Sequence, residues 1–91
     1  MKQYYECHIT FTGDALEGEA AVKYVRWKWS HIAGDPIMGA GVRQYATMHY
    51  NVRKDKDWIW QRMQDIRTFL DTAGLPVSRC KIEVVLMDER Y

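Results

Sequence analysis

The chain of 91 residues has few of the features that assign a protein to a special class. It holds only two cysteines, far apart and without a C-x-x-C pair, which is a poor signal for a metal or redox site. No apolar run approaches the roughly 18–20 residues that a membrane-spanning helix needs. The formal net charge is +1, so no strong overall field attracts the chain to nucleic acid or to an anionic membrane.

The first residues also lack the apolar stretch of a secretion signal, so we expect a cytoplasmic protein with reduced thiols. A content of 47% hydrophobic and 27% charged residues is ordinary for a globular chain, and residues 1–91 are expected to form one domain. Cys7 and Cys80 fall on the apolar faces of expected strands, where a thiol behaves as a small hydrophobe. We expect no cofactor and no metal site, because the histidine spacing matches no ligand motif.

Alternation, helical spacing and turn residues divide the chain into six elements. Strands are expected over residues 3–12, 27–32, 42–51 and 77–87. Helices are expected over residues 14–26 and 55–73, the first opened by Asp14 and the second closed by Gly74 and Pro76. The apolar stripe of the first helix is Leu16, Ala20, Ala21, Tyr24 and Val25, and that of the second is Ile59, Met63, Ile66, Leu70 and Ala73.

The order of these elements, β-α-β-β-α-β, is that of ferredoxin-like α+β folds. Right-handed crossovers place both helices on one face of a four-stranded antiparallel sheet. The first and third strands are then central neighbours. Residues 33–41 contain three glycines and a proline, which indicates a loop between the second and third strands.

Two short motifs stand inside the predicted central strands. His8-Ile9-Thr10 reads H-x-T, and Thr47-Met48-His49 reads T-x-H. Side chains alternate along a strand, so the histidines and threonines share one face while the residues between them face the core. The sheet is therefore predicted to be apolar on the helix side and to carry imidazoles and hydroxyls on the open side.

Such a face could bind a phosphorylated ligand, because an imidazole exchanges protons near neutral pH and hydroxyls hold phosphoryl oxygens. It could equally be a solvated sheet surface. On the second strand either Trp29 and His31 or the residues that alternate with them face the same way. The candidate ligand-binding residues are His8, Thr10, Trp29, His31, Asp35, Thr47, His49, Lys81 and Glu83. If the protein is an enzyme, His8 and His49 are the candidate acid and base.

Four tryptophans are many for so small a chain. Trp58 and Trp60 diverge on a helix, so a single core cannot cover all four, and at least one is expected at the surface. Exposed tryptophans would suit a homodimer contact, or a protein-interaction module that inhibits a host protein.

The H-x-T triplet resembles one half of a 2H phosphoesterase, a family whose active site takes an H-x-[ST] motif from each of two lobes. The resemblance implies hydrolysis of cyclic or 2′,5′-linked nucleotides. Only His8-Ile9-Thr10 matches in the forward sense, the second triplet is reversed, and the chain is about half the expected length. A homodimer that brings two copies of His8 together would supply the missing lobe.

A second resemblance covers most of the chain. Residues 29–36 (W-S-H-I-A-G-D-P), 39–42 (G-A-G-V), 45–47 (Y-A-T) and 81–83 (K-I-E) resemble small phage and bacterial proteins with the pattern F-S-x-I-x-G-D-P-x-x-G-x-G-V-K-x-Y-x-T and a later K-x-E strand. This resemblance implies a phage or mobile-element origin and, by analogy, counter-defence in a host cytoplasm. Our leading hypothesis is a homodimeric domain that binds a nucleotide or other phosphorylated small molecule; the alternatives are a phosphoesterase and the interaction module.

Overall fold

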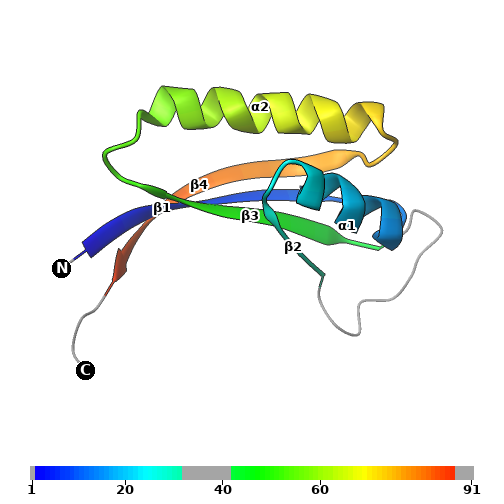
Figure 1. The fold of residues 1–91 in the computed structure, drawn as a ribbon, viewed down its shortest axis with the longest axis horizontal. Helices are drawn as coiled ribbons and strands as arrows, with labels where there is room; N and C mark the ends of the chain where they lie inside the picture. The colour runs from blue at the N-terminus through cyan, green and yellow to red at the C-terminus, as the bar shows by residue number, and fades with distance from the viewer. Residues whose placement is uncertain (1, 32–41, 88–91) are drawn as a thin grey trace.

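The computed structural model describes residues 2–31 and 42–87, which form a single sheet with two helices. The elements are β1 (Lys2–Phe11), α1 (Ala15–Tyr24), β2 (Lys28–His31), β3 (Gln44–Asn51), α2 (Lys56–Thr72) and β4 (Val77–Met87). All neighbouring strands are antiparallel, in the order β2-β3-β1-β4, and both helices lie on one face (Figure 1). The predicted ferredoxin-like topology is confirmed.

The helices begin and end where the local sequence predicts. The side chain of Asp14 accepts a hydrogen bond from the backbone N–H of Glu17 at 2.9 Å, which satisfies a free donor of the first turn of α1. Asp55 caps α2 in the same way. After α2, Gly74 has a φ of +78°, the left-handed conformation that lets the chain turn into β4.

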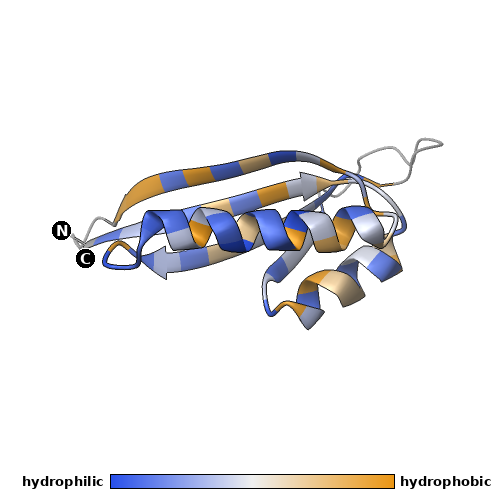
Figure 2. Ribbon diagram, turned by 90° about the horizontal axis from the view of Figure 1, so that it is seen from above, coloured by the Kyte–Doolittle hydropathy of each residue, from blue (hydrophilic) through white to orange (hydrophobic). Residues whose placement is uncertain are grey.

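The core lies between the sheet and the helices. Residues that face the core alternate with more polar ones over residues 6–11, 45–49 and 79–84, in β1, β3 and β4 (Figure 2). Cys7 is fully buried and Cys80 is half-buried, both with free thiols. The other fully or almost fully buried apolar side chains are Ile9, Phe11, Val22, Trp27, Ala46, Ile59, Met63, Ile66, Leu70 and Leu75.

Helix α1 differs from the prediction in the face that it buries. Leu16 and Tyr24 were expected to pack inward, but they are 79% and 78% exposed, and the buried residues are Gly18 and Val22. The reason is a close approach to the sheet: a Cβ at Gly18 would lie 1.8 Å from Oε1 of Gln44. Only glycine allows the helix this near, and this position rotates Leu16 and Tyr24 away from the core.

Gln44 is the buried polar residue of the described core, and it joins three segments. Its Oε1 accepts a hydrogen bond from the indole N–H of Trp29 at 2.8 Å. Its Nε2 donates to the backbone carbonyl oxygens of Gly13 and Asp14 at 3.0 and 3.3 Å. Because these bonds satisfy the buried amide, Gln44 fixes β2 and the start of α1 against β3.

The tryptophans divide between core and surface. Trp27 is 4% exposed, whereas Trp58 and Trp60 are 47% and 45% exposed, which confirms that one core does not cover all four. Among the described residues, neither helix combines the length and the apolar character needed to cross a membrane.

Candidate functional site

The open face of the sheet, turned away from the helices, carries polar side chains in three rows that run across the strands. The strand register defines the rows. The first row, from β2 to β4, is Ser30, Tyr45, Thr10 and Arg79. The second row is Lys28, Thr47, His8 and Lys81. The third row is His49, Glu6 and Glu83.

The members of the first two rows other than Lys28 line a hollow of about 420 Å³, within the usual size range of small-molecule sites. All four strands contribute to its lining, which is Ser30, Tyr45, Thr47, His8, Thr10, Arg79 and Lys81. The two cations both come from β4. Hydroxyl groups and the imidazole stand between them and β2, so the hollow is basic on one side and hydroxyl-rich on the other.

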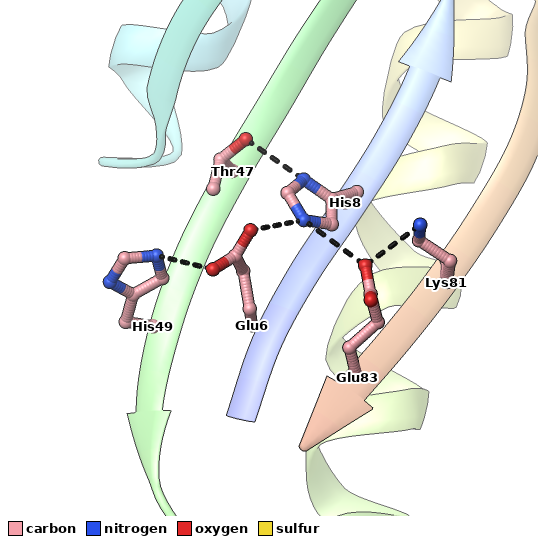
Figure 3. Close-up of polar contacts among 6 residues, drawn as sticks. All are labelled: Glu6, His8, Thr47, His49, Lys81 and Glu83. Carbon is pink, nitrogen blue, oxygen red and sulfur yellow. Dashed lines mark hydrogen bonds and ion pairs between the residues drawn. The ribbon is translucent and has the colours of Figure 1, made fainter. Parts of the chain in front are cut away.

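His8 is at the centre of the open face and is held from both ring nitrogens (Figure 3). Its Nε2 lies 2.6 Å from Oε1 of Glu6, and its Nδ1 lies 3.2 Å from Oγ1 of Thr47. A carboxylate can only accept, so Nε2 carries a proton, and in the neutral imidazole Nδ1 accepts from the Thr47 hydroxyl. The ring is thereby fixed in orientation, with its side chain 24% exposed.

Glu6 contacts a second histidine as well. Its Oε2 lies 3.5 Å from Nε2 of His49, whose side chain is 56% exposed and whose ring centroid is 4.8 Å from that of Tyr4 (Figure 3). The Glu6 carboxylate therefore lies between the imidazoles of His8 and His49. It is in the third row, so it lies on the opposite side of His8 from the first row. This arrangement links the H-x-T and T-x-H motifs through a residue that belongs to neither.

The charges on β4 differ in their pairing. Nζ of Lys81 lies 2.7 Å from Oε1 of Glu83, and this hydrogen bond with its ion pair lowers the pKa of the Glu83 carboxyl group below its ordinary value of 4.5. Oε1 of Glu83 is also 3.7 Å from Nε2 of His8. By contrast, no carboxylate of the described residues lies within ion-pair distance of Arg79. Arg79 is one of the residues that line the hollow.

The candidate residues predicted from the sequence do not all meet here. His8, Thr10, Thr47 and Lys81 line the hollow, and His49 and Glu83 lie in the adjoining third row. Asp35 is outside the described residues. Within the described part of the chain, no group of three or more acidic, histidine or cysteine side chains is placed to hold a metal ion.

Trp29 and His31, which were candidate ligand-binding residues, lie on the other face of the sheet. The register sets Trp29 opposite Ala46 and His31 opposite Gln44, on the helix side. The physical cause is the hydrogen bond of the Trp29 indole to buried Gln44, which fixes the alternation of β2 and turns Lys28 and Ser30 to the open face.

Five members of the open-face rows were not among the candidate residues: Glu6, Lys28, Ser30, Tyr45 and Arg79. Three of them stand two residues from a predicted member, Glu6 before His8, Tyr45 before Thr47 and Arg79 before Lys81. Because residues two apart share a face of a strand, the same alternation would have identified these three.

Comparison of the chain with protein-family models, with curated proteins and with solved structures finds no match, so the fold and the site rest on the chain's own residues.

Proposed function

We propose that the protein binds a phosphorylated small molecule, specifically a nucleotide, in the hollow of the open face. The observation that carries this proposal is the convergence of Arg79, Lys81 and His8 on one side of a hollow whose other side is lined by hydroxyls. Arginine presents a planar fork of donors that matches phosphate oxygens, and its charge-assisted hydrogen bonds are stronger than neutral ones.

The layout of the hollow suggests how a nucleotide would lie in it. The phosphate group is proposed to contact Arg79 and Lys81 on β4, with Thr10 as a further donor. The ring of Tyr45 and the hydroxyl of Ser30 stand toward β2 and would meet the base and the sugar. From β4 to β2 the sheet spans three strand spacings, about 14 Å, which is comparable to the length of a nucleotide.

Calorimetric titration and thermal shift with mono-, di- and cyclic nucleotides, and with inorganic phosphate, test this proposal. Arg79→Gln is expected to weaken nucleotide binding by about 10- to 150-fold, the scale of a lost charged hydrogen bond of about 1.5–3 kcal/mol. The matched control is Arg53→Gln, which removes the same charge from the exposed turn after β3, at the other end of the sheet. Wild-type protein that binds no member of the panel contradicts the proposal.

The resemblance to small phage proteins supplies a biological setting for this activity. A domain that sequesters a signalling nucleotide in a host cell would act in counter-defence without consuming its ligand. Recovery of bound nucleotide from protein purified from host cytoplasm would identify the ligand directly.

A second candidate function, phosphoester hydrolysis, is favoured by the Glu6–His8–Thr47 contacts. A carboxylate that orients an imidazole, which in turn contacts a hydroxyl, is the arrangement that activates a nucleophile in many hydrolases. In this alternative His8 acts as the base, and His49, on the same carboxylate, as the acid. Mass spectrometry of nucleotides incubated overnight with wild type and with His8→Gln decides between the two: intact substrate excludes hydrolysis, and turnover that His8→Gln abolishes excludes simple binding.

A further inference from the structure

Strand β4 is an unusually long edge of the sheet. It has 11 residues, and in the strand order it pairs with β1 on one side only. Figure 2 shows it along one border of the molecule, with α2 over the strands beside it. No described strand pairs with its outer side, so a row of backbone donors and acceptors is available there to another strand.

The second half of this edge is apolar on both faces. On the helix side Val84 and Leu86 are each 56% exposed, and Val85 between them faces the open side. Trp60 on α2 is 45% exposed. It shares a helix face with Asp71, whose side chain accepts a hydrogen bond from the backbone N–H of Val77 at the start of β4. Trp60 therefore lies on the side of α2 that faces β4. Natural edge strands are ordinarily protected by charges, proline or a covering segment, and in β4 the charges are confined to residues 79–83.

We infer that β4 pairs antiparallel with β4 of a second copy, in a register centred on Ile82. Ile82 is the midpoint of the strand, so this register pairs all 11 residues. It sets Lys81 opposite Glu83 of the partner subunit and, by symmetry, Glu83 opposite the partner's Lys81. Val84 then lies beside the partner's Cys80, which covers part of its exposed surface.

Charge selects this register over its neighbours. In an antiparallel strand pair, two residues that lie directly opposite each other point to the same face of the sheet. If the helices of both copies are on the same side, a residue can only lie opposite one that is an even number of positions away. The two-fold axis then passes through a residue and not between two residues. Moving that axis by one residue places Lys81 opposite a second Lys81, or Glu83 opposite a second Glu83. Like charges directly opposite one another destabilise a strand pair. The register centred on Lys81 also sets Arg79 opposite Glu83 of the partner subunit. Of these three registers, only the one centred on Ile82 combines two attractive pairs with no pair of like charges.

The resulting dimer has one continuous eight-stranded sheet, with all four helices on one side and both hollows on the other. His8 is one strand away from β4 in each copy, so the two β1 strands are about 14 Å apart across the two-fold axis. The inference does not depend on the proposed function, since the pairing needs no ligand.

Sedimentation velocity on wild type and on Lys81→Glu, Glu83→Lys and the double charge swap tests the pairing. Wild type is expected to be a dimer, each single reversal to raise the dimer dissociation constant at least about tenfold, and the double swap to restore it, because the pairs are then attractive with exchanged signs. Lys28→Glu, on edge strand β2, is the matched control and is expected to leave the dimer intact.

Circular dichroism checks that each variant is folded. Wild type that remains monomeric at hundreds of micromolar overturns the inference and leaves the edge to a different partner. It is equally overturned by a dimer that neither single reversal weakens, or that the double swap does not restore.

Discussion

The indole N–H of Trp29 donates to the side-chain oxygen of Gln44 at 2.8 Å, inside the core rather than at the open face. This bond decides which side chains of β2 reach the candidate site. It also means that an aromatic residue which we expected to contact ligand has a structural role. The first prediction follows from the burial of its acceptor.

Gln44→Leu is expected to lower the free energy of unfolding by about 2–4 kcal/mol. The substitution leaves the Trp29 N–H without a partner, which costs about 1–3 kcal/mol. It also removes the hydrogen bonds that the amide donates to the carbonyl oxygens of Gly13 and Asp14, although each oxygen keeps a backbone donor. Urea unfolding measures the change. Gln61→Leu, at an exposed glutamine that bonds Asp65, is the control and is expected to change stability by no more than about 0.5 kcal/mol.

Gly18→Ala is expected to destabilise the protein although alanine is the better helix former. Helix propensity alone would add about 1 kcal/mol of stability. The new Cβ, however, would lie 1.8 Å from Oε1 of Gln44, and relieving such overpacking costs about 1–3 kcal/mol. Ala20→Gly, an exposed position of the same helix, supplies the propensity effect without the clash. A Gly18→Ala variant more stable than wild type would show that α1 does not pack as described.

Thr47→Val removes the hydroxyl that faces His8 while keeping the shape of the side chain. If the open face only binds, affinity for the nucleotide is expected to fall about two- to tenfold, equivalent to one neutral hydrogen bond of about 0.5–1.5 kcal/mol. If Thr47 is an activated hydroxyl, turnover is lost altogether. Titration calorimetry and product analysis on the same samples separate these results, and Thr68→Val on helix α2 serves as the control.

Stability is expected to fall in alkaline solution, in part because of Cys7. Burial, and next the charge of Glu6, raise the pKa of its thiol from an ordinary 9.0 to about 11 in the folded protein. Below pH 9 the thiol is protonated in both states and this contribution is complete. As the pH rises from 9 toward 11 the unfolded chain loses the proton first, so about 2–3 kcal/mol is lost.

Cys7→Ala is the test of that assignment. The cavity that the substitution leaves lowers the free energy of unfolding by a similar amount at every pH. The informative quantity is therefore the change of that free energy with pH. Urea unfolding at neutral pH and at about pH 10.5 should show a smaller alkaline loss in the variant than in wild type. The loss does not vanish, since burial also raises the pKa values of Cys80 and Tyr50. Equal slopes would contradict the assignment to Cys7.

The fold could be predicted because its elements carry local signals that tertiary packing does not override. Asp14 and Gly74 mark helix ends through their own hydrogen bonding and backbone geometry. The buried stripe of α2 is regular, and four of its five expected residues, Ile59, Met63, Ile66 and Leu70, are buried. Helix α1 was misjudged because its packing depends on the absence of a side chain at Gly18, and hydrophobic spacing contains no information on close approach.

The site was predictable only in part for a similar reason. Alternation within β1 and β3 correctly grouped His8, Thr10 and Thr47. The strand β2 has only four residues, and its alternation is fixed by a bond between Trp29 and a glutamine 15 positions away. No pattern within such a short segment decides its orientation, so Ser30 could not be distinguished from His31 as a member of the open face.

The buried amide of Gln44 has a consequence for the nucleotide binding that we propose for the open face. Tyr45 and Ser30 line the hollow on the side nearest β2. They directly follow Gln44 and Trp29 in the chain, so the hydrogen bond between Gln44 and Trp29 holds the backbone that carries them. A ligand that fits this side of the hollow binds without a large loss of conformational entropy in the protein. Such pre-organisation favours affinity. The same rigidity penalises ligands of a different shape, because the wall cannot adjust without breaking a buried hydrogen bond. We therefore expect narrow selectivity on the side of the base and sugar, and tolerance on the side of the flexible Arg79 and Lys81.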